Sequence, residues 1–90
     1  MPQTSVKSLL EDSKGNIWIG TWNEGLYRYD PEEGKYFAYP KMNERKSAHV
    51  VFEDSHHQIW VGTWEGGLFL LKNPYDMERV SWDVFRNEPA

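Results

Sequence analysis

The strongest constraint on this chain is that it repeats itself. Residues 11–29 return as residues 53–71 without a gap, so every matched pair is separated by 42 positions. The two copies share ten identical residues, which in the first copy are Glu11, Asp12, Ser13, Ile17, Trp18, Gly20, Thr21, Trp22, Gly25 and Leu26. The fold must therefore contain two similar units in tandem.

The length and content of one repeat favour a blade of a β-propeller. A period in the low forties, with short strands and glycine turns, is typical of such blades. Turn residues divide each repeat into four expected strands, which cover residues 5–11, 16–22, 25–30 and 35–40, then 48–53, 58–64, 67–72 and 79–85. We therefore expect an all-β fold of two tandem four-stranded antiparallel blades, residues 1–41 and residues 42–90.

The first turn of each repeat starts at an aspartate, Asp12 or Asp54, at a position that favours capping of backbone N–H groups. Gly15 supplies a positive φ in the first repeat, and His57 stands in its place in the second. Histidine is one of the few non-glycine residues enriched at positive φ. We predict a left-handed conformation at His57, at some cost in strain.

Both faces of each predicted sheet are apolar. Ile17 and Ile19 point to one side and Trp18 to the other, whereas a sheet with one wet face alternates apolar and polar residues. We expect Trp18 and Trp60 to pack between blades. Two blades cannot close a ring, so the chain is predicted to be a partial propeller, completed by other blades of the same parent chain or by oligomerisation.

Composition excludes several classes of function. The net charge is −4 with no basic run, which argues against a nucleic-acid partner. The apolar stretches are too short to span a bilayer, so direct membrane insertion is not expected, and no signal peptide is visible at the start of the sequence. There is no cysteine for a disulfide or a thiolate metal site.

Residues 12–30 carry the motif Asp-x-x-Gly-Asn-Ile-Trp-Ile-Gly-Thr-x-x-x-Gly-Leu-Tyr-x-Tyr-Asp, which resembles the two-component regulator propeller repeat. Residues 54–71 resemble it with His57 at the turn and without the final Tyr-Asp. The resemblance covers roughly residues 5–72. It implies two blades of the periplasmic sensor of a bacterial hybrid two-component protein, which responds to glycans and signals to a kinase. No kinase core, receiver or DNA-binding domain is present in this sequence.

The candidate ligand-binding residues lie where the second strand of each repeat ends. A tryptophan face beside carboxylate or amide groups could stack on a sugar ring and hydrogen-bond its hydroxyls, and aromatic surface with a few polar groups is typical of small-ligand sites. The alternative is that these tryptophans only cap the adjacent blade. The candidates are Trp22, Asn23 and Glu24 in the first repeat and Trp64 and Glu65 in the second.

Neither a metal site nor a catalytic site is expected. His56 and His57 lie beside Asp54, but adjacent side chains usually diverge, and the first repeat has no equivalent histidines. No nucleophile and base are arranged for catalysis, so we expect no enzyme activity, no catalytic residue and no cofactor.

Two alternatives to the sensor segment stay open at this point. Two-blade protomers could assemble into a closed ring, because propellers commonly have ~4–8 blades, and form a lectin-like carbohydrate-binding module. The chain could also be a fragment of a propeller polysaccharide lyase or glycosidase, which would need carboxylates at a defined separation in the central channel.

Overall fold

The chain folds into two four-stranded antiparallel sheets, as the repeat predicts. The structure is a computed structural model, and it describes residues 6–22, 24–39, 48–63 and 67–85. In the first sheet the strands are β1 (Val6–Glu11), β2 (Ile17–Thr21), β3 (Leu26–Asp30) and β4 (Lys35–Ala38). In the second they are β5 (Val50–Glu53), β6 (Ile59–Gly62), β7 (Leu68–Lys72) and β8 (Ser81–Phe85).

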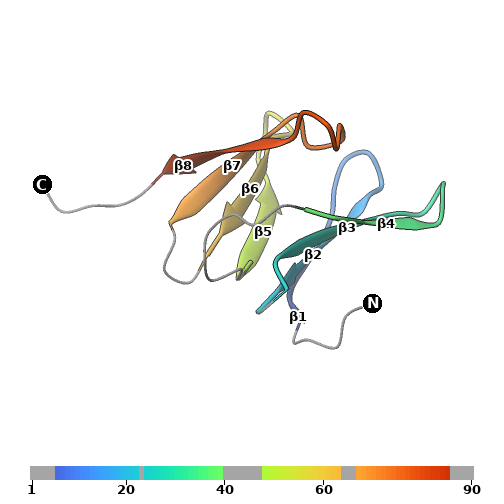
Figure 1. The fold of residues 1–90 in the computed structure, drawn as a ribbon, viewed down its shortest axis with the longest axis horizontal. Helices are drawn as coiled ribbons and strands as arrows, with labels where there is room; N and C mark the ends of the chain where they lie inside the picture. Colours follow the sequence, from blue (N-terminus) through green and yellow to red (C-terminus); the bar gives the residue numbers. More distant parts are fainter. Residues whose placement is uncertain (1–5, 23, 40–47, 64–66, 86–90) are drawn as a thin grey trace, which may run out of the picture.

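In both sheets each strand pairs with the next one along the chain, which is the meander of a propeller blade (Figure 1). The all-β prediction and the two blades are confirmed, and the two sheets do not close into a ring. The register repeats as well: Gly20 pairs with Leu26 in the first sheet and Gly62 with Leu68 in the second.

The turns follow the local chemistry of the sequence. Gly15 has φ 86° and His57 has φ 63°, so the predicted left-handed histidine is confirmed. The Asp12 carboxylate accepts hydrogen bonds from the backbone N–H groups of Lys14 and Asn16. Asp54 does the same for His56 and Gln58. Because these bonds close each β-turn locally, they form in both repeats alike.

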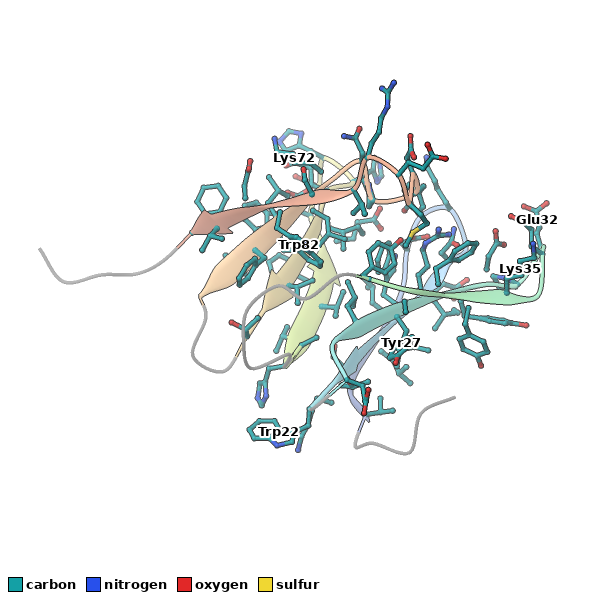
Figure 2. The ribbon with its side chains drawn as sticks, in the orientation of Figure 1. Trp22, Tyr27, Glu32, Lys35, Lys72 and Trp82 are labelled. Carbon is teal, nitrogen blue, oxygen red and sulfur yellow. The ribbon has the colours of Figure 1, made fainter. Side chains whose placement is uncertain are left out.

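The two sheets pack face to face, and each blade has two sides that we name by their residues. The tryptophan face carries Trp18 in the first blade and Trp60 in the second. The isoleucine face carries Ile17 and Ile19 in the first blade and their equivalents, Ile59 and Val61, in the second. The tryptophan face of the first blade packs on the isoleucine face of the second, and Figure 2 shows Trp82 between the two sheets.

The core of the molecule lies in this contact between the blades. Trp18, Ile59 and Val61 have no exposed surface. The other buried members of the same cluster are Leu26, Tyr39, Ala48, Val51, Phe69 and Leu71. The prediction that Trp18 packs between blades is therefore confirmed. Trp60 lies on the opposite side of the second blade, where none of the described strands forms a neighbouring blade, and it is partly exposed.

A glycine lets the two blades approach closely. A Cβ atom on Gly20 would lie 2.4 Å from the backbone oxygen of Ala48, which leads into the second blade. At the same place the Ala48 N–H donates a hydrogen bond of 2.8 Å to the Thr21 carbonyl. A backbone contact between the blades therefore excludes any residue with a Cβ atom at position 20.

Candidate functional site

The candidate ligand-binding group of the first blade surrounds Trp22, directly after β2. Its side chain is 37% exposed, and Figure 2 shows it at one edge of the molecule. The Lys7 Nζ atom lies 5.5 Å from the centre of the ring, and the His49 ring meets the indole edge-on at 6.2 Å. An ammonium at this distance is attracted by the indole face. The tryptophan is thus held at the surface with part of its ring accessible.

The turn that follows Trp22 is fixed by Thr21. The Thr21 hydroxyl donates to the Gly25 carbonyl at 2.7 Å and accepts the Glu24 N–H at 3.0 Å. This closes the β2–β3 connection and keeps the exposed Glu24 carboxylate at the same end of the blade as Trp22. The first blade therefore gathers an indole, a carboxylate and an ammonium at one edge. These are groups that can stack on a ring and hydrogen-bond hydroxyls.

The structure describes two of the five predicted site residues, Trp22 and Glu24. Asn23, Trp64 and Glu65 lie outside the described residues. In the second blade the Thr63 hydroxyl donates to the Gly67 carbonyl at 2.8 Å, so the two ends of the corresponding connection are joined by the same bond. Sequence reasoning missed Lys7, because it precedes the repeated segment and reaches Trp22 only across the β1–β2 pair.

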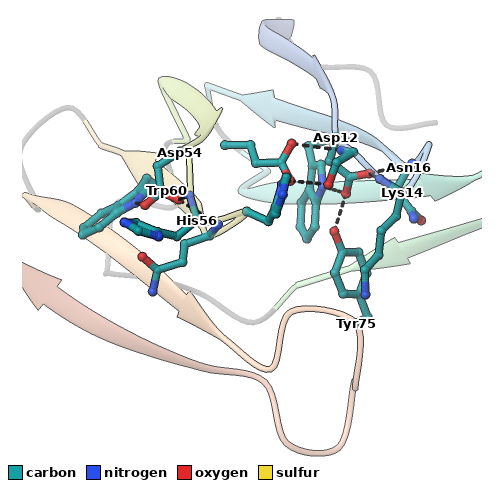
Figure 3. Close-up of polar contacts among 12 residues, drawn as sticks. Asp12, Lys14, Asn16, Asp54, His56, Trp60 and Tyr75 are labelled. Carbon is teal, nitrogen blue, oxygen red and sulfur yellow. Dashed lines mark hydrogen bonds and ion pairs between the residues drawn. The ribbon is translucent and has the colours of Figure 1, made fainter.

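A second group of polar side chains joins the two blades at Asp12 (Figure 3). One carboxylate oxygen, Oδ2, accepts from the Trp18 indole N–H at 2.7 Å and from the Tyr75 hydroxyl at 2.5 Å. Tyr75 belongs to the β7–β8 connection, so this bond crosses between blades. The Lys14 Nζ atom lies 4.5 Å from the centre of the Tyr75 ring.

These contacts set the protonation of both groups. Burial acts to raise the pKa of the Asp12 carboxyl, but hydrogen bonds from Tyr75, Trp18, Asn16 and Lys14 stabilise the carboxylate, and the net pKa is lowered. Burial, together with the bond to Asp12, raises the pKa of the Tyr75 hydroxyl. Asp12 is therefore an anion and Tyr75 a neutral donor at neutral pH.

A buried arginine completes this junction. Arg28 is 4% exposed; its guanidinium donates to the Tyr39 hydroxyl and to the Asn16 side-chain oxygen, each at 2.7 Å. Its Cζ atom lies 4.3 Å from the centre of the Phe37 ring. Tyr39 in turn donates to the Pro74 carbonyl of the second blade. These partners compensate for part of the cost of burying a charge, so we assign the group to the blade contact rather than to ligand binding.

From the sequence, Asp12 was predicted only to cap its turn. The signal for its wider role was the six-residue spacing between aspartate and tryptophan in both repeats. In the second blade Asp54 accepts from the Trp60 indole N–H at 2.8 Å. That bond, with backbone bonds from Gln58 and His56, lowers the pKa of Asp54.

The two adjacent histidines of the second turn are exposed. The His57 Nδ1 atom lies 3.4 Å from the Glu53 carboxylate. No group of three or more metal-ligating side chains occurs within residues 6–22, 24–39, 48–63 and 67–85. Over the same ranges, no helix has the length and apolar character needed to cross a membrane.

Comparison with known proteins agrees with the repeat. A family model, described as two component regulator propeller, matches residues 1–23, a range that contains β1 and β2. The match confirms the resemblance over those residues. No curated protein and no solved structure gives a significant match to the chain.

Proposed function

We propose that this chain is a non-enzymatic segment of the periplasmic β-propeller sensor of a two-component signalling protein, and that the Trp22 edge contacts a glycan. The regulator-propeller match over residues 1–23 supports a regulatory and sensing role. The observation that carries the ligand assignment is the partly exposed Trp22 ring, held beside Lys7 and the turn that bears Glu24.

The chemistry of this edge suits a sugar. The apolar face of a pyranose stacks on an indole, while its hydroxyls need donors and acceptors at the rim, such as an ammonium and a carboxylate. A ligand held here would touch the first blade at the end of β2. It would thereby reach the region where Thr21 joins the second blade through Ala48. Ligand binding and blade packing would then be linked through adjacent residues.

Calorimetric titration with two oligosaccharides of matched length, one neutral and one containing uronic acids, tests the proposal. We expect saturable binding to the wild-type chain that is lost in Trp22→Ala. Tyr36→Ala is the matched control, because Tyr36 is also an exposed aromatic but lies on β4, at the edge of the sheet opposite β1. Equal binding by wild type and Trp22→Ala, or no binding of either oligosaccharide, would contradict the assignment of Trp22.

The lectin-like alternative is favoured by one observation, namely that the two-blade stack has an open apolar face at each end. In that case the Trp22 site would be repeated around an assembly rather than serve a kinase. The sugar titration does not separate the two functions. A closed trimer or tetramer of fixed mass in solution would support the lectin-like module, whereas a monomer, or a mass that rises with concentration without limit, would support the sensor segment.

A further inference from the structure

Two sheet faces are left open at opposite ends of the two-blade stack. The tryptophan face of the second blade carries Trp60 between the rings of Phe52 and Phe85, whose centres lie 6.3 and 5.4 Å from it. Phe52 is 41% exposed and Phe85 50%. The isoleucine face of the first blade exposes Leu9 by 67%, and Figure 2 shows Tyr27 on the side of this blade that points away from the second. Contiguous apolar surface of this kind marks a binding site.

The open tryptophan face has the geometry of the covered one. Trp18 packs on Tyr39 with ring centres 5.1 Å apart and an interplanar angle of 47°. Trp60 packs on Phe85, which occupies the same sheet position, at 5.4 Å and 54°. The indole of each tryptophan is held by the aspartate of its own turn. The second blade thus presents the surface that receives a blade in the first.

The open isoleucine face likewise matches the covered one. Leu9, Ile17 and Ile19 stand 42 positions before three buried residues of the internal contact, Val51, Ile59 and Val61. The chain therefore carries both halves of one interface, one at each end.

Gly62 gives a second, independent indication. Its φ is not positive, and a Cβ atom there would meet nothing closer than 3.8 Å. Nothing in the described chain therefore requires glycine at this position. Glycine inside a strand loses conformational entropy and leaves a side-chain position unpacked. Its equivalent, Gly20, is required only because Ala48 of the next blade crosses it.

A polar contact at the rim is duplicated in the same way. Across the internal contact, the Ser13 backbone N–H and hydroxyl donate to the two oxygens of Glu53, at 2.9 and 2.7 Å. The equivalent residues are Ser55, beside the open tryptophan face of the second blade, and Glu11, on the open isoleucine face of the first. Within the part of the chain that the structure describes, the Ser55 hydroxyl and the Glu11 carboxylate have no such partner.

We propose that a second copy of this chain docks head to tail, with its first blade on the Trp60 face, and repeats the internal contact between blades. Glu11 of the incoming copy then accepts the hydrogen bonds of Ser55, and its β1 crosses Gly62. Such an interface is heterologous, so each copy keeps one open face and the pair keeps one face of each kind. The inference goes beyond the proposed sensing role, since it requires no ligand.

Several hydrogen bonds of the internal contact are not reproduced between copies. The β3–β4 connection of the incoming copy has Glu32 and Glu33 where the β7–β8 connection has Tyr75, so no tyrosine reaches Asp54 as Tyr75 reaches Asp12. The Tyr39 bond to the Pro74 carbonyl is also missing, because Phe85 has no hydroxyl. So is the Val51 N–H bond to Ser8, because Val50 replaces that serine. The contact between copies therefore lacks three of the hydrogen bonds that join the blades within the chain. We expect reversible association that depends on concentration.

Two variants, each blocking one face, test the arrangement by sedimentation equilibrium. Phe52→Glu places a charge on the open tryptophan face, and Leu9→Glu places one on the open isoleucine face. Both positions are exposed, so the fold should persist, which circular dichroism checks. We expect the mass of the wild-type chain to rise with concentration, while each variant alone stays monomeric. Because each variant keeps the face that the other has lost, their mixture should form a dimer of twice the monomer mass and nothing larger.

The outcomes separate the alternatives. Glu78→Gln, an exposed charge change away from both faces, should associate like wild type. A wild-type chain that stays monomeric at every concentration overturns the proposal. Association that survives in either blocking variant also overturns it, since like faces would then pair or another surface would be responsible. A mixture of the two variants that remains monomeric overturns it as well, because the two intact faces would then not bind each other. Loss of sugar binding by Trp22→Ala leaves these masses unchanged, so failure of the two proposals can be told apart.

Discussion

The two blades have nearly the same structure but different neighbours. Each carries a tryptophan bonded to the aspartate of its own turn, and a glycine two residues further along the strand. Around Trp18 a second blade covers the sheet, and the indole has no exposed surface. Around Trp60 the same sheet face is open. The comparison separates the contacts that form within one blade from the burial that a neighbouring blade adds.

The neighbour adds burial and also polar contacts that the repeat alone does not contain. Tyr75 donates to Asp12 from the second blade, while no residue described here does so for Asp54. The positions also diverge in the sequence, because buried Arg28 of the first blade corresponds to Leu70 of the second. The first tryptophan face thus holds a buried charge and makes polar contacts with the blade that covers it. The second has an apolar residue, Leu70, at the matching position.

The largest expected difference between the blades is at the two tryptophans. Trp18→Ala should lower the free energy of unfolding by about 3–5 kcal/mol, since it removes a fully buried large aromatic side chain. Trp60→Ala should cost roughly 1 kcal/mol, because a partly exposed ring gains only a part of the ~1.5–3 kcal/mol of full burial. Urea denaturation at low protein concentration measures both. Equal costs would mean that the two faces are equally covered.

The next difference concerns the bond between Tyr75 and Asp12. Tyr75→Phe should cost about 1.5–3 kcal/mol at neutral pH, the range for a hydrogen bond to a charged group. The pKa of Asp12 is lowered from 3.8 in the folded chain. Its contribution to stability is therefore complete above the unfolded value and is lost as the pH falls through the folded value. The cost of Tyr75→Phe should shrink accordingly as the pH is lowered below about 4.

Denaturation of wild type and Tyr75→Phe at neutral and acid pH checks this dependence. Asp54→Asn serves as the control, because Asp54 has the same turn and the same tryptophan but no tyrosine partner among the described residues. Combining it with Tyr75→Phe should leave the cost of the tyrosine change unaltered. A cost that does not vary with pH would show that Tyr75 stabilises the contact by packing alone.

The smallest expected change in stability is at the two glycines, where the two substitutions should have effects of opposite sign. Gly20→Ala should destabilise by about 1–3 kcal/mol, since the added methyl group overlaps a backbone oxygen and the blades must shift apart. Gly62→Ala would place its methyl group in ordinary contact with Val50, 3.8 Å away, and should stabilise the monomeric chain by about 0.5–1 kcal/mol, because alanine loses less entropy in a strand. Thermal unfolding of both variants compares them directly. Destabilisation by Gly62→Ala in the monomer would contradict the open face.

Much of the local structure could be read from the sequence because local chemistry decides it. His57 takes its left-handed conformation for the same reason as Gly15, and Asp12 and Asp54 cap their own turns through bonds that span a few residues. The candidate site was harder to predict from the sequence. Trp22 and Glu24 follow from the repeat, but Lys7 joins them only through the pairing of β1 with β2, which the repeated segment does not include.

The sequence by itself determined that there are two blades, where their strands and turns lie, and that both faces of each sheet are apolar. Those features depend on residues close together in the chain. Only the tertiary structure decided that Trp18 is buried and Trp60 partly exposed, that Arg28 lies in the contact, and that Tyr75 meets Asp12. Identical residues differ in burial because burial depends on the neighbouring blade. Among the residues that the structure describes, the first blade's tryptophan face has such a neighbour and the second's does not.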